Sequence, residues 1–368
     1  MSETKTINKP LVSVLCTTYN HVKYIREALD SILEQETNFE FEVLINDDAS
    51  TDGTTQIIRE YEKKHPRTIT AIYHEDNQYQ KGVRHMMAHF LLPRVKGKYI
   101  AICEGDDYWT DPKKLQKQVN CLESNKDCSI CFHPVEIKHE NGNQKDTTFP
   151  EEMQPDNFTI NRLIKSNFIH TNSVMYRTQE NYKDIKLNMH PGDWYLHLYH
   201  AQFGEVCFID EVMSIYRRHK DSMWSSRFKN ETTFWRNHGA RQLAFYNEVH
   251  SMFEGDKEKK DSVKSNIADA LEAIYEYSEA DSATIIEESI SLDDTGVISL
   301  SVSSLIGRIQ QKEGLIKEID RQLKDQHVAI KQLQGVLQAR GEEIKNIKAS
   351  RVWTVRNFIA KLLGREVV

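Results

Sequence analysis

The first 140 residues alternate short apolar runs with segments of helical periodicity. The apolar runs have the length of strands, whereas the segments between them repeat apolar residues every three or four positions. We predict strands at 12–19, 41–46, 68–74 and 98–103, and helices at 25–33, 54–64, 82–95 and 113–122. This alternation is typical of βαβ units that build a largely parallel sheet.

The pattern after residue 128 is less regular. It predicts strands at 129–137, 171–177 and 205–217, and helices at 157–166 and 194–203. Beyond about residue 223 the strand signal ends, and helical segments follow at 240–249 and 265–278. We therefore predict an α/β domain over 1–225, with a doubly wound mixed sheet flanked by helices, and a helical region over 226–300.

A seven-residue repeat of apolar positions marks the segment 301–349. Its members are Ile309, Ile316, Leu323, Ile330, Leu337 and Ile344. Such a repeat predicts a left-handed coiled coil, through which the chain would form a homo-oligomer. The alternative is a long helix packed on its own domain. Half of the d positions are polar, so the repeat does not distinguish a dimer from a trimer.

The last segment, 350–368, reads as a basic amphipathic helix. Val352, Val355, Ile359, Leu362 and Leu363 share one helical face, and four arginine and lysine residues accompany them. Such a helix can lie on an anionic membrane surface, or it can dock on the rest of the protein.

Composition narrows the class of protein. The net charge of -7 argues against a nucleic-acid partner. The N-terminus has no secretion signal, and no run of about 18 apolar residues is found. The expected location is the cytoplasm, or the inner face of the cell membrane if the tail binds lipid.

The six cysteines are too sparse to form a disulfide framework, and we expect them to be reduced. Cys128 and Cys131 have CxxC spacing, with His133 nearby, which raises the alternative of a zinc or redox site. Against this, the pair lies in an apolar run with no second pair of ligands.

Paired acids follow two of the predicted strands, as Asp47 and Asp48 and as Asp106 and Asp107. Ligands of open α/β sheets bind beyond the carboxyl ends of the strands, so the pairs are candidates for one cleft. Adjacent carboxylates repel each other unless a cation lies between them, and hard oxygen ligands suit Mg²⁺ or Mn²⁺. The alternative is that these acids only cap turns and helices.

Three stretches together resemble the inverting family 2 glycosyltransferases of the GT-A fold. They are VSVLCTTYNHVKYIREALDSILEQ, FEVLINDDASTDGT and KGKYIAICEGDDYWTDPKKLQKQV. The resemblance covers about residues 11–119, with weaker similarity to about 225. It implies a GT-A sheet, a nucleotide-diphosphate donor such as a UDP-sugar, and a saccharide or lipid-linked saccharide acceptor in bacterial surface polysaccharide synthesis.

The same resemblance implies roles for residues on the donor side. Thr17 and Tyr19 would line the base pocket, and Asp48 would accept a hydrogen bond from the base or ribose. Arg84 would neutralise phosphate charge, although its KGVRH context departs from the family pattern. For Tyr19 and Asp48, strand-end packing and a turn acid are the structural alternatives.

The acidic motif EGDD would bind the metal and the sugar nucleotide. By the resemblance, Asp107 is the ligand of Mn²⁺ or Mg²⁺ and Asp106 contacts the sugar nucleotide. Glu104 stands where many relatives have aspartate. His219 would help to hold the metal or the diphosphate, with an ordinary structural histidine as the alternative.

Asp193, in NMHPGDWYLHL, matches the position of the family's catalytic base at the start of a helix. Gly192 would allow a tight turn, and Trp194 would form an apolar wall against a sugar ring. The alternative is that Asp193 only caps the helix. His170, Thr171 and Asn172 would touch the acceptor, unless they form a buried bulge.

Two other functions compete with glycosyl transfer. A sugar-phosphate nucleotidyltransferase would carry a glycine-rich nucleotide loop near its N-terminus, and LVSVLCTTYN contains no glycine. A catalytically idle scaffold could work through the coiled coil alone, but it would not need Asp48, Asp106, Asp107 and Asp193 together.

Overall fold

The computed structural model describes residues 9–140, 145–151, 153–180, 182, 185–186, 189–219 and 231–277, with 355, 358 and 359. The chain divides into two compact units, Met1–Phe228 with Met252–Ser262, and Lys229–Ser251 with Val263–Val368. The predicted coiled coil at 301–349 lies outside the described residues. The predicted tail helix at 350–368 also lies outside them, apart from residues 355, 358 and 359.

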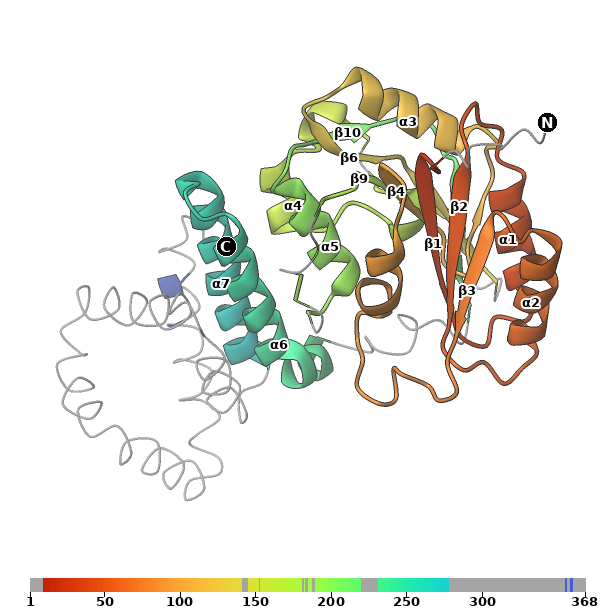
Figure 1. The fold of residues 1–368 in the computed structure, drawn as a ribbon. Helices are drawn as coiled ribbons and strands as arrows, with labels where there is room; N and C mark the ends of the chain where they lie inside the picture. Colours follow the sequence, from red (N-terminus) through yellow and green to blue (C-terminus); the bar gives the residue numbers. More distant parts are fainter. Residues whose placement is uncertain are drawn as a thin grey trace. The chain divides into compact units, whose positions relative to one another are not determined.

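A seven-stranded sheet forms the centre of the first unit (Figure 1). Its strands are β1 (Val12–Thr18), β2 (Phe41–Asp47), β3 (Ile69–Tyr73), β4 (Tyr99–Ile102), β6 (Cys128–Phe132), β9 (Met175–Arg177) and β10 (Glu205–Phe208). Their order is β10-β6-β9-β4-β1-β2-β3. Strand β9 runs antiparallel to β4 and β6, and the remaining pairs are parallel. The predicted mixed α/β sheet is confirmed.

Four further strands form a smaller sheet in the order β5-β11-β7-β8. They are β5 (Tyr108–Trp109), β7 (Val135–His139), β8 (Thr147–Phe149) and β11 (Ser214–Arg218). The single strands predicted at 129–137 and 205–217 are therefore wrong, because each is divided between the two sheets. Pro134 separates β6 from β7, since proline cannot donate a ladder hydrogen bond. The charged residues Asp210 and Glu211 lie between β10 and β11.

Helices flank the large sheet. They are α1 (Ile25–Leu33), α2 (Thr54–Lys64), α3 (Lys114–Ser124), α4 (Ile160–Lys165) and α5 (Gly192–Ala201), with short 3-10 turns at Pro155–Asn157 and Thr171–Ser173. Figure 1 shows α1 and α2 to one side of β1, β2 and β3, and α5 to the other. Apolar residues of α1, such as Ile25, Leu29 and Ile32, are fully buried and join one core with β1 and β2.

The helix predicted at 82–95 begins later than expected. A π-helical turn spans Met87–Leu91 and a 3-10 turn spans Leu92–Arg94. Gly82 has a φ of +99°, which takes the chain out of the helical region, and the His85 side chain accepts a hydrogen bond from the Ala88 amide. Residues 77–85 therefore form a loop.

The second unit contains most of helices α6 (Glu231–Met252) and α7 (Lys257–Tyr277). Helix α6 includes the segment predicted at 240–249, and α7 includes the segment predicted at 265–278 as far as residue 277. Each helix buries apolar side chains, among them Leu243, Phe245 and Val249 in α6 and Val263 and Ile267 in α7. Among the helices in the described part of the chain, none combines the length and the apolar character needed to cross a membrane.

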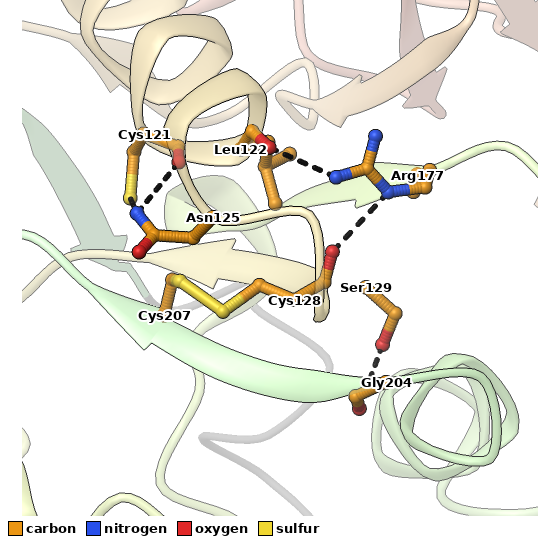
Figure 2. Close-up of a disulfide and its surroundings, with 8 residues drawn as sticks. All are labelled: Cys121, Leu122, Asn125, Cys128, Ser129, Arg177, Gly204 and Cys207. Atoms are coloured by element: carbon orange, nitrogen blue, oxygen red, sulfur yellow. Dashed lines mark hydrogen bonds between the residues drawn. A yellow bond between two sulfur atoms is a disulfide. The ribbon is translucent and has the colours of Figure 1, made fainter.

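The expectation that all six cysteines are reduced is wrong for two of them. Cys128 in β6 and Cys207 in the neighbouring strand β10 form a disulfide, with their Cα atoms 6.0 Å apart (Figure 2). Cys131, the other member of the CxxC pair, is a buried free thiol. The disulfide thus fastens the edge strand β10 to the sheet, and Cys128 is not available as a zinc ligand.

Lys114, at the start of α3, is an unusual member of the core because its side chain is fully buried. Its ammonium group donates to Gln118 Oε1 at 2.7 Å and lies 4.2 Å from the centre of the Trp109 ring. Burial lowers the pKa of Lys114 from 10.5 to about 7.

This shift predicts a specific pH dependence of stability. Between pH 7 and 10.5 the unfolded chain binds a proton that the native Lys114 does not, so stability rises with pH in this window. Relative to Lys114→Met, the wild type should gain up to about 1.4 kcal/mol of unfolding free energy per pH unit from pH 7 to 9. Denaturant unfolding measures this, with the exposed neighbour Lys113→Met as a control. If the unfolding free energies of wild type and Lys114→Met changed in parallel with pH, the lowered pKa of Lys114 would be contradicted.

Candidate active site

The acidic stretches after β2 and β4 meet at the carboxyl end of β1. The Asp48 amide donates to Thr18 O at 3.0 Å, and the Gly105 amide donates to Thr17 O at 3.0 Å. Strand β1 lies between β2 and β4, and the chain passes from β3, on one side of β1, to β4 on the other. Such a reversal opens a crevice beyond the strand ends, which is where ligands of open α/β sheets bind.

Gly105 allows the loop after β4 to pack tightly against the loop after β1. A Cβ atom at this position would lie 2.6 Å from Thr18 Oγ1 and 3.0 Å from His21 Nδ1. Neither distance leaves room for a side chain, so the glycine of EGDD is required by close approach. The loop that carries Asp106 is thereby held against His21.

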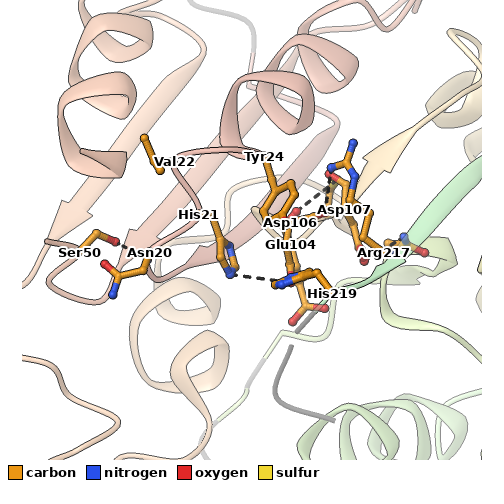
Figure 3. A network of polar contacts seen from close by, with 12 residues as sticks. Asn20, His21, Val22, Tyr24, Ser50, Glu104, Asp106, Asp107, Arg217 and His219 are labelled. Atoms are coloured by element: carbon orange, nitrogen blue, oxygen red, sulfur yellow. Dashed lines mark hydrogen bonds and ion pairs between the residues drawn. The ribbon is translucent and has the colours of Figure 1, made fainter. Parts of the chain in front are cut away.

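Asp106 faces two histidines (Figure 3). Its Oδ2 atom lies 3.1 Å from His219 Nε2 and 3.8 Å from His21 Nε2. Burial opposes ionisation, but the two imidazoles outweigh it and lower the pKa of Asp106. Asp106 is thus held as a half-buried carboxylate at the crevice, next to the histidine that sequence analysis selected.

Glu104 lies in the same electrostatic environment. Burial, together with the carboxylates of Asp106 and Asp193, raises the pKa of Glu104 to about 8. Asp193, at the start of α5, is thus near enough to Glu104 for its charge to act on that carboxyl group. The roles predicted for these acids stay predictions.

Asp107 has a different environment from the one predicted for a metal ligand. Its side chain is 1% exposed, and its two oxygens accept hydrogen bonds from the Arg217 amide at 2.9 Å and Asn172 Nδ2 at 3.0 Å. Burial, with the nearby charges of Asp106 and Glu104, raises the pKa of Asp107 well above its usual range. The geometry therefore does not suit the prediction that Asp107 binds the metal.

Arg217 connects several of the surrounding segments (Figure 3). Its guanidinium donates to Asp106 O at 2.9 Å, contacts Glu27 of α1, and lies 4.2 Å from the centre of the Tyr108 ring. The Arg217 side chain is only 6% exposed. Its cation thus offsets acidic charge from behind the crevice and supports the backbone of Asp106.

The residues predicted for the donor side surround the end of β1. Tyr19 is 39% exposed, and Thr17 is half-buried at the strand end. Asp48 is 4% exposed, and its carboxylate accepts hydrogen bonds from the amides of Gln78 at 2.6 Å and Tyr79 at 3.2 Å. Both Asp48 oxygens are thus engaged within the chain, and its contact with a nucleotide stays a prediction.

Arg84, the predicted phosphate contact, is exposed and turned toward its own loop. Its guanidinium donates to Tyr79 O at 2.6 Å and lies 4.5 Å from the centre of the Tyr79 ring. The contact with a phosphate group stays a prediction.

Asp193 is the second residue of α5, whose N-cap is Pro191, so Asp193 does not cap the helix. Asn167 Nδ2 donates to its Oδ2 atom over a long 3.4 Å. Burial raises the pKa of Asp193, which makes its carboxylate a stronger base than an exposed aspartate.

Two predictions for the acceptor side are wrong. Trp194 is 8% exposed and donates its indole N–H to Leu163 O at 2.7 Å, so it packs α5 on α4 and forms no wall for a sugar. Asn172 is fully buried, with its amide group bound to Asp107, Ile215 O and Ser214 Oγ. Asn172 therefore supports the acidic loop, and it does not contact an acceptor. The half-buried His170 and Thr171 precede it.

Sequence analysis missed two histidines near the acids. His21 follows directly after TTYN, so its place at the end of β1 was a usable signal. His85 gave no such signal, because its partner, the Gly192 carbonyl, is 107 positions away in the sequence. The distance from His85 Nε2 to Gly192 O is 2.8 Å.

The described residues contain no group of three or more His, Cys, Asp or Glu side chains with the geometry of a metal site. The chemistry of the crevice nevertheless fits a hard cation, because Mg²⁺ is commonly held by one or two carboxylates together with substrate phosphates. Glu104 and Asp106 supply such a pair, and burial together with the charge of Asp106 raises the pKa of Glu104.

The chain was compared with known proteins. The family model described as Glycosyl transferase family 2 matches residues 13–222. An uncharacterised Mycobacterium tuberculosis protein, Rv1520, is 41% identical over 249 residues, which are 68% of this chain and 70% of that protein. A putative teichuronic acid biosynthesis glycosyltransferase, TuaG of Bacillus subtilis, is 29% identical over 62% of this chain and 86% of its own.

Among solved structures, the mannosyltransferase PcManGT from Pyrobaculum calidifontis, in complex with GDP-Man and Mn²⁺, matches with a TM-score of 0.48 and 15% identity. The match covers 90% of this chain and 88% of that one. The family model spans more than half of the chain, and it includes the ends of β1, β2 and β4 together with α5. The protein therefore belongs to glycosyl transferase family 2 and is a glycosyltransferase.

Proposed function

We propose that this enzyme is a metal-dependent, inverting glycosyltransferase. It would move a sugar from a nucleotide-diphosphate donor, a UDP-sugar in the first place, to a saccharide or lipid-linked saccharide in bacterial polysaccharide synthesis. The observation that carries the proposal is the position of Glu104 and Asp106 at the carboxyl end of β1, with Asp106 beside His21 and His219 and with Asp193 near enough to act on Glu104 electrostatically. The similarity to a putative teichuronic acid glycosyltransferase supports a saccharide acceptor.

The donor nucleotide would bind at the end of β1. The exposed Tyr19 ring offers a flat apolar face for the base, and Thr17 lies two positions before it in the chain. Asp48 would accept a hydrogen bond from the base or the ribose through a remaining lone pair of its carboxylate. Arg84 would have to leave the Tyr79 carbonyl to reach a phosphate group.

In our proposal the metal-binding role passes from Asp107 to Asp106, with Glu104 as the second oxygen donor and His219 beside them. The side chain of Asp106 is 17% exposed, whereas Asp107 is buried and both of its oxygens are bound within the protein. Mn²⁺ or Mg²⁺, when bound, supplies positive charge that stabilises the departing diphosphate.

Asp193 would act as the catalytic base. Its carboxylate takes the proton of the acceptor hydroxyl while that oxygen forms a bond to the anomeric carbon. The bond from this carbon to the diphosphate oxygen breaks, and its electron pair leaves with the nucleoside diphosphate. Attack from the face opposite to the leaving group inverts the anomeric configuration.

The segments outside the described residues would place the enzyme at its substrate. We propose that the 301–349 repeat joins copies of the chain and that the basic tail at 350–368 brings it to the inner face of the cell membrane. A lipid-linked acceptor would be within reach of an enzyme held there.

Replacement of the base is the direct test of the chemistry. Asp193→Asn should lower the rate of sugar transfer by about 10² to 10⁴-fold, because an amide cannot accept the hydroxyl proton. Donor binding, measured by calorimetry with Mn²⁺, should change little. Transfer at the wild-type rate would refute the role of Asp193.

The two acids of EGDD should separate in a metal titration. Asp106→Asn should raise the Mn²⁺ concentration for half-maximal nucleotide release by at least about tenfold. Asp107→Asn should instead cost about 1–3 kcal/mol of stability, because its new N–H₂ group meets the donors of Asn172 or Arg217. A shifted Mn²⁺ requirement in Asp107→Asn alone would restore the original assignment.

Nucleotide release from a panel of UDP- and GDP-sugars identifies the donor. We expect release with Mn²⁺ to exceed that with EDTA, and to increase when a suitable glycan is added. Absence of release from every sugar nucleotide, with and without glycans, would favour the idle scaffold.

A further inference from the structure

The loop at residues 77–85, which we call the linking loop, is fastened at one end to the carboxyl end of β2. The amides of Gln78 and Tyr79 donate to the two carboxylate oxygens of Asp48, at 2.6 Å and 3.2 Å. Asn77 Nδ2 donates in turn to Asp48 O at 3.1 Å. The loop therefore begins on the acid that we assign to the donor side.

The linking loop is also closed on itself. The Val83 amide donates to Gln78 O at 3.0 Å, and the Gly82 amide donates to Tyr79 O at 3.1 Å. The Arg84 guanidinium adds a hydrogen bond to the same Tyr79 carbonyl at 2.6 Å. These bonds fix the backbone immediately before His85.

His85 joins the other end of the loop to α5. Its side chain is 6% exposed; Nδ1 accepts from the Ala88 amide at 3.3 Å, and Nε2 lies 2.8 Å from Gly192 O. A neutral ring protonated at Nε2 satisfies both contacts. A Cβ on Gly192 would lie 2.8 Å from His85 Cδ2, so the ring packs directly against the glycine backbone.

The contact lies in the first turn of α5, which Trp194 also fastens to α4 through Leu163 O. The N-cap residue, Pro191, makes no side-chain capping hydrogen bond, and Asn167 Nδ2 reaches the Asp193 carboxylate only over a long 3.4 Å. The direction of the Asp193 carboxylate therefore depends in part on the backbone at Gly192, to which His85 is bound. Misplacement of a reacting group by about 1 Å can cost about 100-fold in rate.

We propose that His85 is a positioning residue for Asp193, and that through the linking loop it couples the donor-side acid Asp48 to the base. This inference rests on the proposed role of Asp193. His85 touches neither donor nor acceptor in this assignment. It acts by holding the first turn of α5 at a fixed distance from the end of β2.

Three substitutions separate the contacts of His85. His85→Gln carries an amide N–H that reaches as far as Nε2, so it should retain the bond to Gly192 and most of the activity. His85→Asn can still accept from the Ala88 amide but is too short to reach Gly192. His85→Phe keeps the bulk of the ring and loses both hydrogen bonds.

The measurement is kcat and donor KM for transfer, with the sugar nucleotide of the UDP- and GDP-sugar panel that reacts fastest. His85→Phe and His85→Asn should lower kcat about 10- to 100-fold, while the donor KM stays within about twofold of the wild-type value. His85→Gln should retain most of the wild-type kcat. His89→Phe, a half-buried neighbour outside the loop, is the matched control, and thermal melting checks that each variant is folded. Equal kcat for wild type, His85→Asn and His85→Phe would overturn the inference.

A double-mutant cycle tests whether His85 acts through Asp193. On the Asp193→Asn background, His85→Phe should lower the residual rate little further, because the positioned group is already disabled. The same fold-loss on both backgrounds would overturn the coupling. If no residual rate is measurable, the recovery in His85→Gln and the separation of kcat from KM decide. Wild-type transfer by Asp193→Asn would instead refute the proposed base itself.

Discussion

The carboxylate of Asp107 connects the two sheets of the protein. It follows β4 of the large sheet, accepts the amide of Arg217 in β11 of the small sheet, and accepts the side chain of Asn172 from the turn before β9. Because these contacts bury Asp107, its neighbour Asp106 is left on the crevice side, opposite His219. The position of the acidic loop, and of every group around it, depends on this one buried carboxylate.

Charge in the crevice is balanced unevenly. Arg217 supports the acidic loop, and two histidines lower the pKa of Asp106 against the effect of burial. Burial and the acidic neighbours of Glu104 raise its pKa instead. A crevice with this excess of carboxylates repels a bare diphosphate and attracts a cation. In the proposed function, the donor would therefore enter most easily together with its metal ion.

Much of the fold could be predicted from the sequence, because short apolar runs mark the buried strands β1 and β2, and helical periodicity marks the buried faces of α1 and α2. The errors arose where the determining contact is remote in sequence. The pairing of Cys128 with Cys207 spans 79 residues, and the inward direction of Trp194 depends on Leu163 of α4. A period of two or 3.6 residues carries no information about such contacts.

The site was predicted in its residue types more accurately than in its geometry. Strand ends placed the acids in one region, and the family resemblance selected Asp193. Neither source could decide which of Asp106 and Asp107 faces solvent, because strand alternation ends at Ile102 and the loop direction is set by Gly105, Asn172 and Arg217.

Because Gly105 has no side chain, the turn after β4 packs directly on the turn after β1, and the two turns cannot change in sequence independently. The turn after β1 would carry the nucleobase pocket, and the turn after β4 would carry the cation ligands. Where the two turns meet, Gly105 faces Thr18 with only a hydrogen atom in place of a side chain. A substitution that enlarges either turn must be matched by a change in the other. A change of donor nucleotide would therefore require changes in both turns, since the base pocket cannot be reshaped while the acidic turn keeps its present position.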